Sequence, residues 1–262
     1  MRIAVAGGTG TVGKHVVDVV RERRHEPVVL ARSSGVDLLT GAGLAAALAG
    51  VDAVIDVANL FTQNEDEARA FFGSTTRNLL DAEKAAGVTH HVLLGIVGSQ
   101  KSRYGYYLGK MAQEQLVHAG EVPWTELRAT QFHEFAEQIY GIARLGPIVL
   151  APTGRVQPIA AREVAERLVE LALGAPSGLV AELAGPREEN LLRMVRAAAR
   201  ATGKPGPILG VPAPGPGGRA MRDGTLLPDP TLVPPTRLGT QTFDEWIAAL
   251  PKPAPQAGPP KK

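Results

Sequence analysis

The chain has 262 residues, of which 44% are hydrophobic and 21% are charged, as in ordinary globular proteins. Its net charge of +2 is too small to indicate a nucleic-acid partner. The sequence contains no cysteine, which excludes disulfides, thiol catalysis and thiolate metal sites. No apolar run approaches the roughly 20 residues of a membrane span, and the histidines form no recognisable metal-ligand pattern. We therefore expect a cytoplasmic protein with no membrane, nucleic-acid or metal partner.

The N-terminal segment combines a buried strand, a glycine-rich turn and an amphipathic helix. The apolar run Ile3-Ala4-Val5-Ala6 leads into Gly7-Gly8-Thr9-Gly10-Thr11-Val12-Gly13, and the helix that follows carries valines on one face. Glycines allow backbone N–H groups to approach a diphosphate, toward which the positive end of the helix points. The spacing fits both G-x-G-x-x-G and G-x-x-G-x-x-G. The cofactor contacts expected here are Gly7, Thr9, Gly10, Thr11, Val12 and Gly13.

The same residues also fit the phosphate loop of nucleoside triphosphatases, because Gly8 to Lys14 reads G-x-x-x-x-G-K. That loop requires a serine or threonine at the next position, whose hydroxyl ligates magnesium. The next residue is His15. The dinucleotide interpretation is therefore favoured over the triphosphatase one.

Strands and helices alternate through the first half of the chain. Apolar runs predict strands at 27–31, 53–58, 91–97 and 124–129. Apolar residues at helical spacing predict helices between them, at 43–49, 65–86 and 104–119. Alternation at this interval is typical of a parallel sheet covered by helices on both faces. The sequence predicts an α/β protein with a Rossmann-like, doubly wound parallel sheet.

The rhythm loosens beyond about residue 130, and proline and glycine become frequent from Pro205 onward. The elements expected here are helices at 132–145, 161–174 and 188–202, and short strands near 148–150, 155–159 and 179–183. We expect three parts: an NAD(P)-binding domain at 1–150, a smaller C-terminal substrate lobe at 151–250 and a disordered tail at 251–262. The lobe should lie over the carboxyl ends of the strands, where open α/β sheets bind ligands.

The second strand ends in Ala31-Arg32-Ser33-Ser34, where NAD-binding domains place an acidic residue for the ribose 2′-hydroxyl. A guanidinium cannot accept a hydrogen bond from that hydroxyl, but it can pair with a 2′-phosphate. The sequence therefore favours NADP over NAD, with Arg32 and Ser33 at the phosphate. Asp37 lies where a carboxylate can accept from the adenine amino group. The alternative for Arg32 is an exposed surface arginine.

Tyr106 and Lys110 lie four residues apart on a predicted helix, so both project from one face. A lysine one turn from a tyrosine favours the tyrosinate and lowers the pKa of the phenol. Such a phenol can protonate a carbonyl oxygen while a hydride arrives at the carbon. A tyrosine and a lysine four residues apart are common by chance. Here the pair follows the later strands of a glycine-loop domain, and this position favours a catalytic interpretation.

Four features together resemble the atypical short-chain dehydrogenase/reductases, and most closely their NmrA-like and isoflavone-reductase-like branch. They are the glycine loop, residues 51–55, Tyr106-x-x-x-Lys110 and residues 124–132. The resemblance covers roughly residues 1–170 and implies bound NADP(H) in a Rossmann domain, with a pocket below a smaller C-terminal lobe. It implies that Lys110 bridges the nicotinamide ribose hydroxyls and that Tyr106 is the acid. It also implies that residues after the third and fourth strands line the cofactor, among them Ala58, Asn59 and Gly95.

The chain departs from this family at one position. Full members of the superfamily place a serine at the end of the strand before the Tyr–Lys helix, where this chain has Gly95 and Ile96. Ser99 or Ser102, farther along the loop, could substitute for it. Gln131 and His133 follow the last strand of the first domain, where the substrate pocket is expected. His133 is either a second candidate proton donor or part of a polar helix start.

These observations lead to two interpretations of the function. The first is an NADP(H)-dependent oxidoreductase that reduces a small or medium carbonyl or enone substrate. The second is an NADP(H)-binding redox sensor of the NmrA type that does not turn over, because the missing serine bears on catalysis more than on cofactor binding. An epimerase or dehydratase is disfavoured because the C-terminal part has no recognisable nucleotide-sugar motif. We expect a monomer or a homodimer.

Overall fold

The structure is a computed structural model that describes residues 1–204 and 206–251. Within these residues, one eight-stranded sheet has the order β13-β10-β5-β4-β3-β1-β2, with β9 beside β5, and every pairing is parallel. The strands are β1 (Arg2–Ala6), β2 (Glu26–Leu30), β3 (Ala53–Asp56), β4 (His90–Ile96), β5 (Trp124–Ala129), β9 (Gly178–Leu179), β10 (Leu183–Ala184) and β13 (Arg237–Leu238). The sheet extends in both directions from β1, which confirms the predicted Rossmann-like, doubly wound α/β fold.

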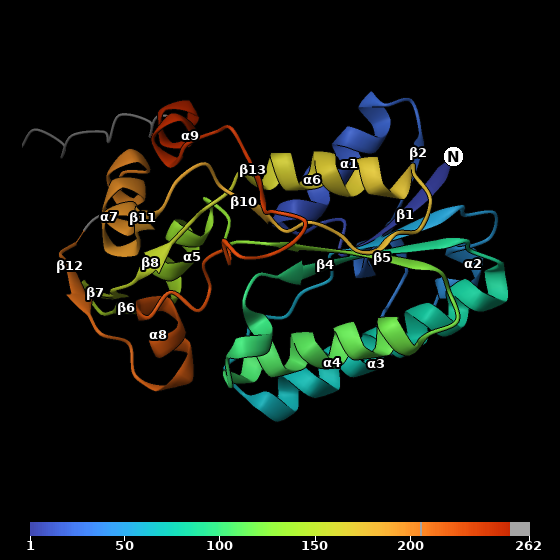
Figure 1. Ribbon diagram of the computed structural model, residues 1–262, viewed down its shortest axis with the longest axis horizontal. Helices are drawn as coiled ribbons and strands as arrows, with labels where there is room; N and C mark the ends of the chain where they lie inside the picture. The colour runs from blue at the N-terminus through green and yellow to red at the C-terminus, as the bar shows by residue number, and fades with distance from the viewer. Residues whose placement is uncertain (205, 252–262) are drawn as a thin grey trace, which may run out of the picture.

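Helices cover both faces of this sheet (Figure 1). α1 (Thr11–Glu22) and α6 (Ala161–Ala172) lie on one face, and α3 (Glu65–Ala86) and α4 (Gly105–Ala119) lie on the other. The short α2 (Leu44–Ala47) follows β2. Because both faces are covered, β3 is buried along its whole length, which explains its apolar run from Ala53 to Ile55.

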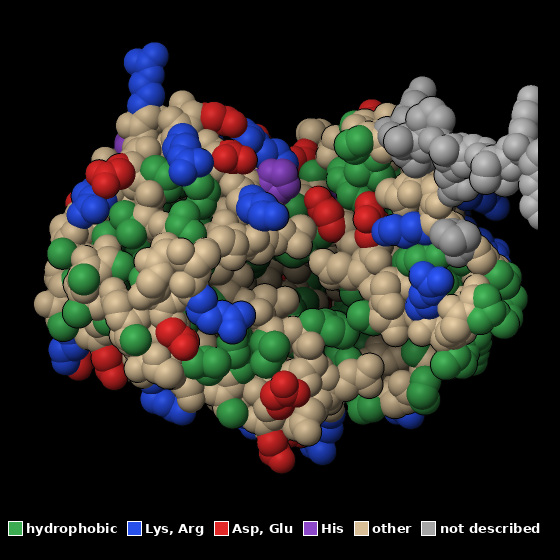
Figure 2. Space-filling view, turned by 180° about the vertical axis from the view of Figure 1, so that it is seen from behind, with side chains coloured by type: hydrophobic (Ala, Val, Ile, Leu, Met, Phe, Trp, Pro, Cys, Tyr) green, Lys and Arg blue, Asp and Glu red, His purple; other side chains and the backbone are tan. Residues whose placement is uncertain are grey.

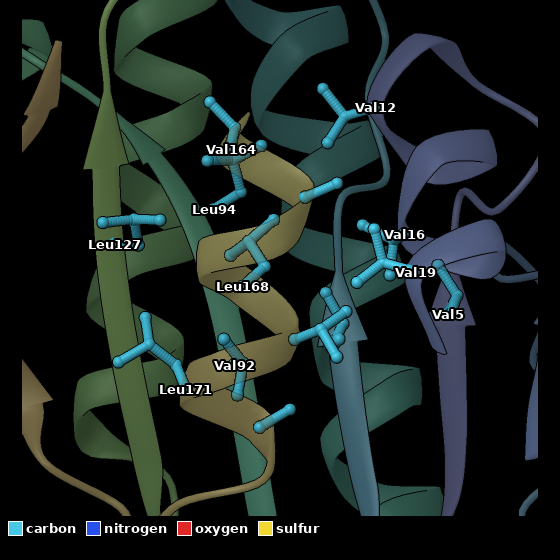
Figure 3. Close-up of a cluster of buried hydrophobic side chains, with 14 of the residues drawn as sticks. Val5, Val12, Val16, Val19, Val92, Leu94, Leu127, Val164, Leu168 and Leu171 are labelled. Carbon is cyan, nitrogen blue, oxygen red and sulfur yellow. The ribbon is translucent and has the colours of Figure 1, made fainter. Parts of the chain in front are cut away.

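The main core lies between the sheet and the α1–α6 layer. Val5, Val92 and Leu127 point from β1, β4 and β5 toward Val16 of α1 and Leu168 of α6 (Figure 3). All five side chains are fully buried. The valines that α1 spaces at helical intervals therefore anchor the glycine loop to the sheet.

A second cluster of elements lies at the carboxyl ends of the strands (Figure 1). Its helices are α5 (Phe135–Ile142), α7 (Leu191–Ala201), α8 (Gly215–Arg222) and α9 (Phe243–Ala249). Its strands are β6 (Arg144–Leu145), β7 (Ile148–Pro152) and β12 (Ile208–Val211), which form one small sheet, and β8 (Arg155–Val156) and β11 (Glu189–Asn190), which form another. Buried residues including Val149, Met194 and Phe243 give this cluster its own core. We call it the lobe.

The chain passes between the sheet and the lobe more than once. Three elements that follow residue 150 are part of the first domain: β10 and β13 are strands of the sheet, and α6 packs on it. In contrast, α5 precedes residue 150 and packs in the lobe. A single boundary at residue 150 therefore does not coincide with the packing. The tail expected to be disordered at 251–262 lies outside the described residues except for Pro251.

Two predicted helices are shorter than expected for identifiable reasons. The helix expected at 132–145 begins at Phe135, because Phe132 forms a parallel bridge with Ile159 instead. The helix expected at 188–202 begins at Leu191, because the side chain of Asn190 caps it by accepting from the Arg193 N–H at 3.0 Å. In the part of the chain that the structure describes, no helix is long and apolar enough to cross a membrane.

Candidate cofactor and substrate site

The glycine loop joins β1 to α1 in a conformation that only glycine permits. Gly7 has φ +78°, and a Cβ there would lie 2.8 Å from the Ala58 Cα. A Cβ on Gly13 would lie 2.1 Å from the Gly7 carbonyl oxygen. Gly10 is the N-cap of α1 and no described side chain caps this end, so the first N–H groups of the helix have no intrahelical partner. This loop fits a diphosphate, since it offers free N–H donors at the positive end of a helix.

The segment after β2 lies beside this loop. β2 pairs with β1 up to Leu30, whose carbonyl accepts from the Gly7 N–H at 3.3 Å. Arg32 is exposed, and the ion pairs among the described residues do not include it. Ser33 is also exposed, and an Asp37 carboxylate oxygen accepts from the Leu39 N–H at 2.9 Å in its own turn. The guanidinium is thus available to an anion next to the loop.

A cavity of about 640 Å³ opens between the strand ends and the lobe. Figure 2 shows a hollow between the two parts of the molecule, with hydrophobic side chains around it. The sequence-predicted residues in its wall are Gly7, Thr9, Gly10, Thr11, Val12, Ala58, Asn59, Gly95, Tyr106, Lys110 and Gln131. The sequence-predicted residues outside its wall are Gly13, Arg32, Ser33, Asp37, Ser99 and His133.

Tyr106 lies near the start of α4, and its side chain reaches the segment that follows β3. Its hydroxyl donates a hydrogen bond to the Asn59 Oδ1 at 2.8 Å. Phe61 and Phe72 pack against its ring, with centroids 5.7 and 6.0 Å away. Burial among these rings raises the pKa of Tyr106, although the hydrogen bond with Asn59 acts in the opposite direction. The phenol therefore keeps its proton at neutral pH.

Lys110 does not lower the pKa of Tyr106 as the sequence suggested. Its ammonium is buried and donates to the Leu94 carbonyl oxygen at 2.8 Å and to the Gln113 side chain. Gln113 in turn donates to an Asp56 carboxylate oxygen at 2.8 Å. Burial lowers the pKa of Lys110, and the charge of Asp56 is the largest effect that opposes this. Lys110 thus stands at the cavity wall, held by the end of β4.

Gly95 and Ile96 stand where the resemblance led us to expect a serine, and the surroundings of Gly95 leave no space for a side chain. A Cβ on Gly95 would lie 2.7 Å from a Glu126 carboxylate oxygen and 2.9 Å from the Arg128 Cγ. Arg128 also pairs with Glu114 at 2.9 Å, so this corner is filled by charged side chains. A serine at Gly95 would require these groups to move.

Neither Ser99 nor His133 reaches the cavity. Ser99 is fully buried and its hydroxyl donates to the Ile96 carbonyl oxygen at 2.9 Å. His133 is fully buried in the lobe, between Phe243 and Trp246, and its Nε2 lies 3.1 Å from the Gln241 carbonyl oxygen. Burial lowers the pKa of His133, so the imidazole is neutral at neutral pH. His133 packs in the lobe core and does not occupy the substrate pocket expected from the sequence.

Gln131 does line the cavity. Both its Oε1 and its Nε2 are buried and have no hydrogen-bond partner among the described residues. An unpaired buried amide costs free energy unless a ligand or water satisfies it. The side chain is therefore free to bind a polar group inside the cavity.

Sequence reasoning missed several residues of the cavity wall, both at the start of α4 and in α8. Tyr104 and Tyr107 line it beside Tyr106, and their rings lie 5.4 Å apart. α8 packs on them through Gly217, where a Cβ would lie 3.0 Å from the Tyr104 ring. The sequence offered no clear signal for this contact, because Gly-Pro-Gly-Gly has the composition of a loop.

The described residues contain no group of three or more histidine, aspartate or glutamate side chains that could hold a metal ion. The cavity instead joins a glycine loop, a buried lysine and a tyrosine hydroxyl. These are the elements of a dinucleotide site with an adjacent proton donor.

Two curated proteins that are similar in sequence to this chain are both named as reductases. The chain is 32% identical over 145 residues to a (4-alkanoyl-5-oxo-2,5-dihydrofuran-3-yl)methyl phosphate reductase of Streptomyces griseus, a match that covers 50% of this chain and 48% of that protein. It is 25% identical over 244 residues to a ceramide reductase of Caulobacter vibrioides, covering 81% of this chain and 74% of that protein. The chain thus spans about half the length of the first relative and about three quarters of the second.

Among solved structures, the UDP-glucose 4-epimerase of Thermus thermophilus in complex with NAD has a TM-score of 0.69 at 20% identity, covering 95% of this chain and 100% of that chain. This likeness shows the fold. The model of the NAD(P)H-binding family matches residues 7–173, from the glycine loop to the end of α6. The match bears out the predicted NAD(P)-binding resemblance, whereas the NmrA-like branch stays a prediction. The chain belongs to the NAD(P)H-binding family.

Proposed function

We propose that the protein is an NADP(H)-dependent oxidoreductase that reduces a carbonyl or enone substrate. The observation that carries this proposal is the Tyr106 hydroxyl, which stands in the wall of the same cavity as the glycine loop. The two relatives are both named as reductases, which supports the reaction class. The free Arg32 guanidinium beside the loop supports NADP over NAD.

The residues of the cavity have separate tasks in this reaction. When bound, NADPH supplies a hydride to the carbon of the substrate. Tyr106 donates its phenolic proton to the oxygen once its hydroxyl has turned from the Asn59 Oδ1 to the substrate. Before the substrate binds, the Asn59 side-chain oxygen holds this hydroxyl by accepting its hydrogen bond. Gln131 offers its unpaired amide N–H to the same substrate oxygen, which is the task of the serine that Gly95 replaces.

Lys110 would hold the nicotinamide ribose in this arrangement. Its ammonium already binds Leu94 and Gln113, so a third donor position is left for a ribose hydroxyl at the cavity wall. This supports a positioning task for Lys110 and assigns no proton transfer to it.

A redox sensor of the NmrA type is the second candidate. The absence of a side chain at Gly95 favours it, because the usual holder of the substrate carbonyl is missing there. Such a protein would bind NADPH without consuming it.

The test is NADPH oxidation over a panel of ketones, aldehydes, enones and quinones, with wild type and Tyr106→Phe. General acid catalysis typically contributes about 10²–10⁴-fold, so Tyr106→Phe should lose turnover by that factor and keep its affinity for NADPH. Tyr107→Phe, which changes the next ring of the same helix, should lose far less. Tight NADPH binding without turnover of any compound would favour the sensor, and full turnover by Tyr106→Phe would exclude Tyr106 as the acid.

A further inference from the structure

The two ends of the cavity are built from different chemical groups. At the nucleotide end the wall includes the glycines and threonines of the loop, Gly7, Thr9, Gly10 and Thr11. At the lobe end the wall is apolar. Its largest members are Phe135, Ile139 and Ile142 of α5, Leu150 of β7, Val211 of β12 and Met221 of α8. The group that binds at the lobe end must therefore be mostly apolar.

Charge is nearly absent from this wall. Among the described residues that line the cavity, Lys110 is the one side chain with a full formal charge. Its ammonium is already bound to the Leu94 carbonyl oxygen and to Gln113 on the sheet side. The described lobe residues of the wall include no cation to pair with a phosphate or a carboxylate, and a buried unpaired charge is costly. Gln138 is the one polar side chain among those same lobe residues, so the wall offers at most an isolated hydrogen bond there.

The apolar surface continues to the outside of the cavity. Ile142 is 56% exposed and Leu150 is 36% exposed, although both also line the cavity. Large apolar side chains at the rim of an apolar cavity give a long substrate more surface to cover. The lobe end therefore suits an extended body more than a compact one.

We propose that the substrate is an uncharged carbonyl compound with an extended apolar body, either an alkyl chain or an aromatic group. Its carbonyl lies at Tyr106 and Gln131, and its body lies between α5, β7 and α8. This inference rests on the proposed reductase function. It separates this protein from reductases and epimerases whose substrates carry phosphate groups, because the described part of the lobe wall has no group to bind them.

The test compares methyl ketones from 2-butanone to 2-undecanone with ω-carboxylated ketones of matched length, using NADPH oxidation by the whole chain. We expect kcat/KM to rise roughly threefold to fourfold for each added methylene that the lobe covers. The terminal carboxylate should lower kcat/KM by at least about 100-fold at the longest length, since it enters an apolar wall without a cation. A preference for the carboxylated or for phosphorylated compounds would overturn the inference.

Two leucines of one hairpin provide matched variants. Leu150 lines the cavity, whereas Leu145 is 69% exposed and is not part of its wall. Leu150→Glu should raise KM for 2-undecanone at least about tenfold, and Leu145→Glu should leave it unchanged. Leu150→Lys should improve the carboxylated ketone relative to wild type. Equal effects at both positions would contradict the proposed location, and unchanged melting temperatures and NADPH affinities would show that both variants are folded.

A second readout distinguishes this inference from the reductase function. Binding of 2-undecanol to the NADP⁺ complex is measured by thermal shift for wild type, Leu150→Glu and Leu145→Glu. If no ketone is reduced but 2-undecanol binds and only Leu150→Glu weakens it, the reductase function fails and the apolar site stands. If ketones are reduced without dependence on chain length and 2-undecanol does not bind, the apolar site fails and the reductase function stands.

Discussion

The two ends of the cavity differ in how their residues come together. The nucleotide end depends on one short segment, from Arg2 to Gly13, that consists of a strand, a glycine turn and a helix start. The lobe end is assembled from four segments between residues 135 and 221 that are far apart in the chain. The first presents backbone N–H groups and the second presents apolar side chains. The comparison shows why cofactor class can be inferred from a short motif while substrate class cannot.

The largest effect that sharpens this comparison is expected at Gly13. A Cβ there would lie 2.1 Å from the Gly7 carbonyl oxygen, so Gly13→Ala must displace the loop. We expect NADPH binding to become undetectable by calorimetry and the free energy of unfolding to fall by about 1–3 kcal/mol, the usual cost of overpacking.

The matched control for Gly13→Ala is Gly141→Ala in the lobe. Apart from its chain neighbours and the backbone of its own helix, no atom of the described residues lies within 4 Å of the position that a Cβ on Gly141 would take. This variant should bind NADPH as wild type does. If Gly13→Ala also binds NADPH normally, the loop is not the diphosphate site.

Arg32 gives the next effect at the nucleotide end. A hydrogen bond to a charged group contributes about 1.5–3 kcal/mol, so Arg32→Ala should weaken NADPH by that amount and leave NADH nearly unchanged. Titration of both dinucleotides measures the difference. The control is Arg200→Ala, because Arg200 is also an exposed arginine but lies on α7. It should change the affinity for neither NADPH nor NADH. Equal losses for both dinucleotides after Arg32→Ala would mean that the guanidinium does not bind the 2′-phosphate.

A substitution of His133 tests how much this buried side chain contributes to the free energy of unfolding. His133→Phe keeps an aromatic ring beside Phe243 and Trp246 but leaves the buried Gln241 carbonyl without its donor. We expect a loss of about 1–3 kcal/mol in the free energy of unfolding. The rate constant kcat should not change, because His133 lies outside the cavity wall. A large drop in kcat with normal stability would restore His133 as a proton donor.

The smallest expected effect is the pH dependence of the contribution that His133 makes to the free energy of unfolding. Burial lowers the pKa of His133 below its usual value of 6.5, although Glu163 and Glu189 partly oppose this. The unfolded chain therefore takes up a proton that the folded chain excludes as the pH falls below 6.5. The stability that His133 provides should be complete above that pH and should decrease by at most about 1.4 kcal/mol per pH unit below it.

Urea unfolding of wild type and His133→Phe between pH 8 and pH 5 measures this difference. The gap in unfolding free energy between the two proteins should narrow toward acid. A gap that is constant, or that widens toward acid, would show that His133 is charged in the folded protein.

The strands and helices of the first half could be predicted closely, because each carries a local signal. α3 has its predicted bounds, 65–86, and β5 has its predicted bounds, 124–129. α8 was not predicted, since its Gly-Pro-Gly-Gly start has the composition of a loop. It forms because Gly217 lets the helix approach the Tyr104 ring, which is a tertiary contact.

The candidate site shows the same division. Tyr106, Asn59 and Gln131 were predicted and do line one cavity. Ser99 and His133 were also predicted for the substrate pocket, and both are buried elsewhere. Their distance from the strand ends along the chain can be read from the sequence, but the direction of their side chains cannot.

The sequence by itself determined the fold class and the glycine loop, because a strand, a glycine turn and a helix start are set by neighbouring residues. Gly7 and Gly13 are required in this loop because a Cβ there would clash with the backbone. It also supplied the basis for proposing NADP, through an arginine in place of an acid at the end of β2. Only the tertiary structure decided that Lys110 binds Leu94 and Gln113 and that charged side chains fill the space at Gly95. It alone also showed that the lobe end is apolar, since those contacts join residues that are distant in the chain and depend on how the helices pack.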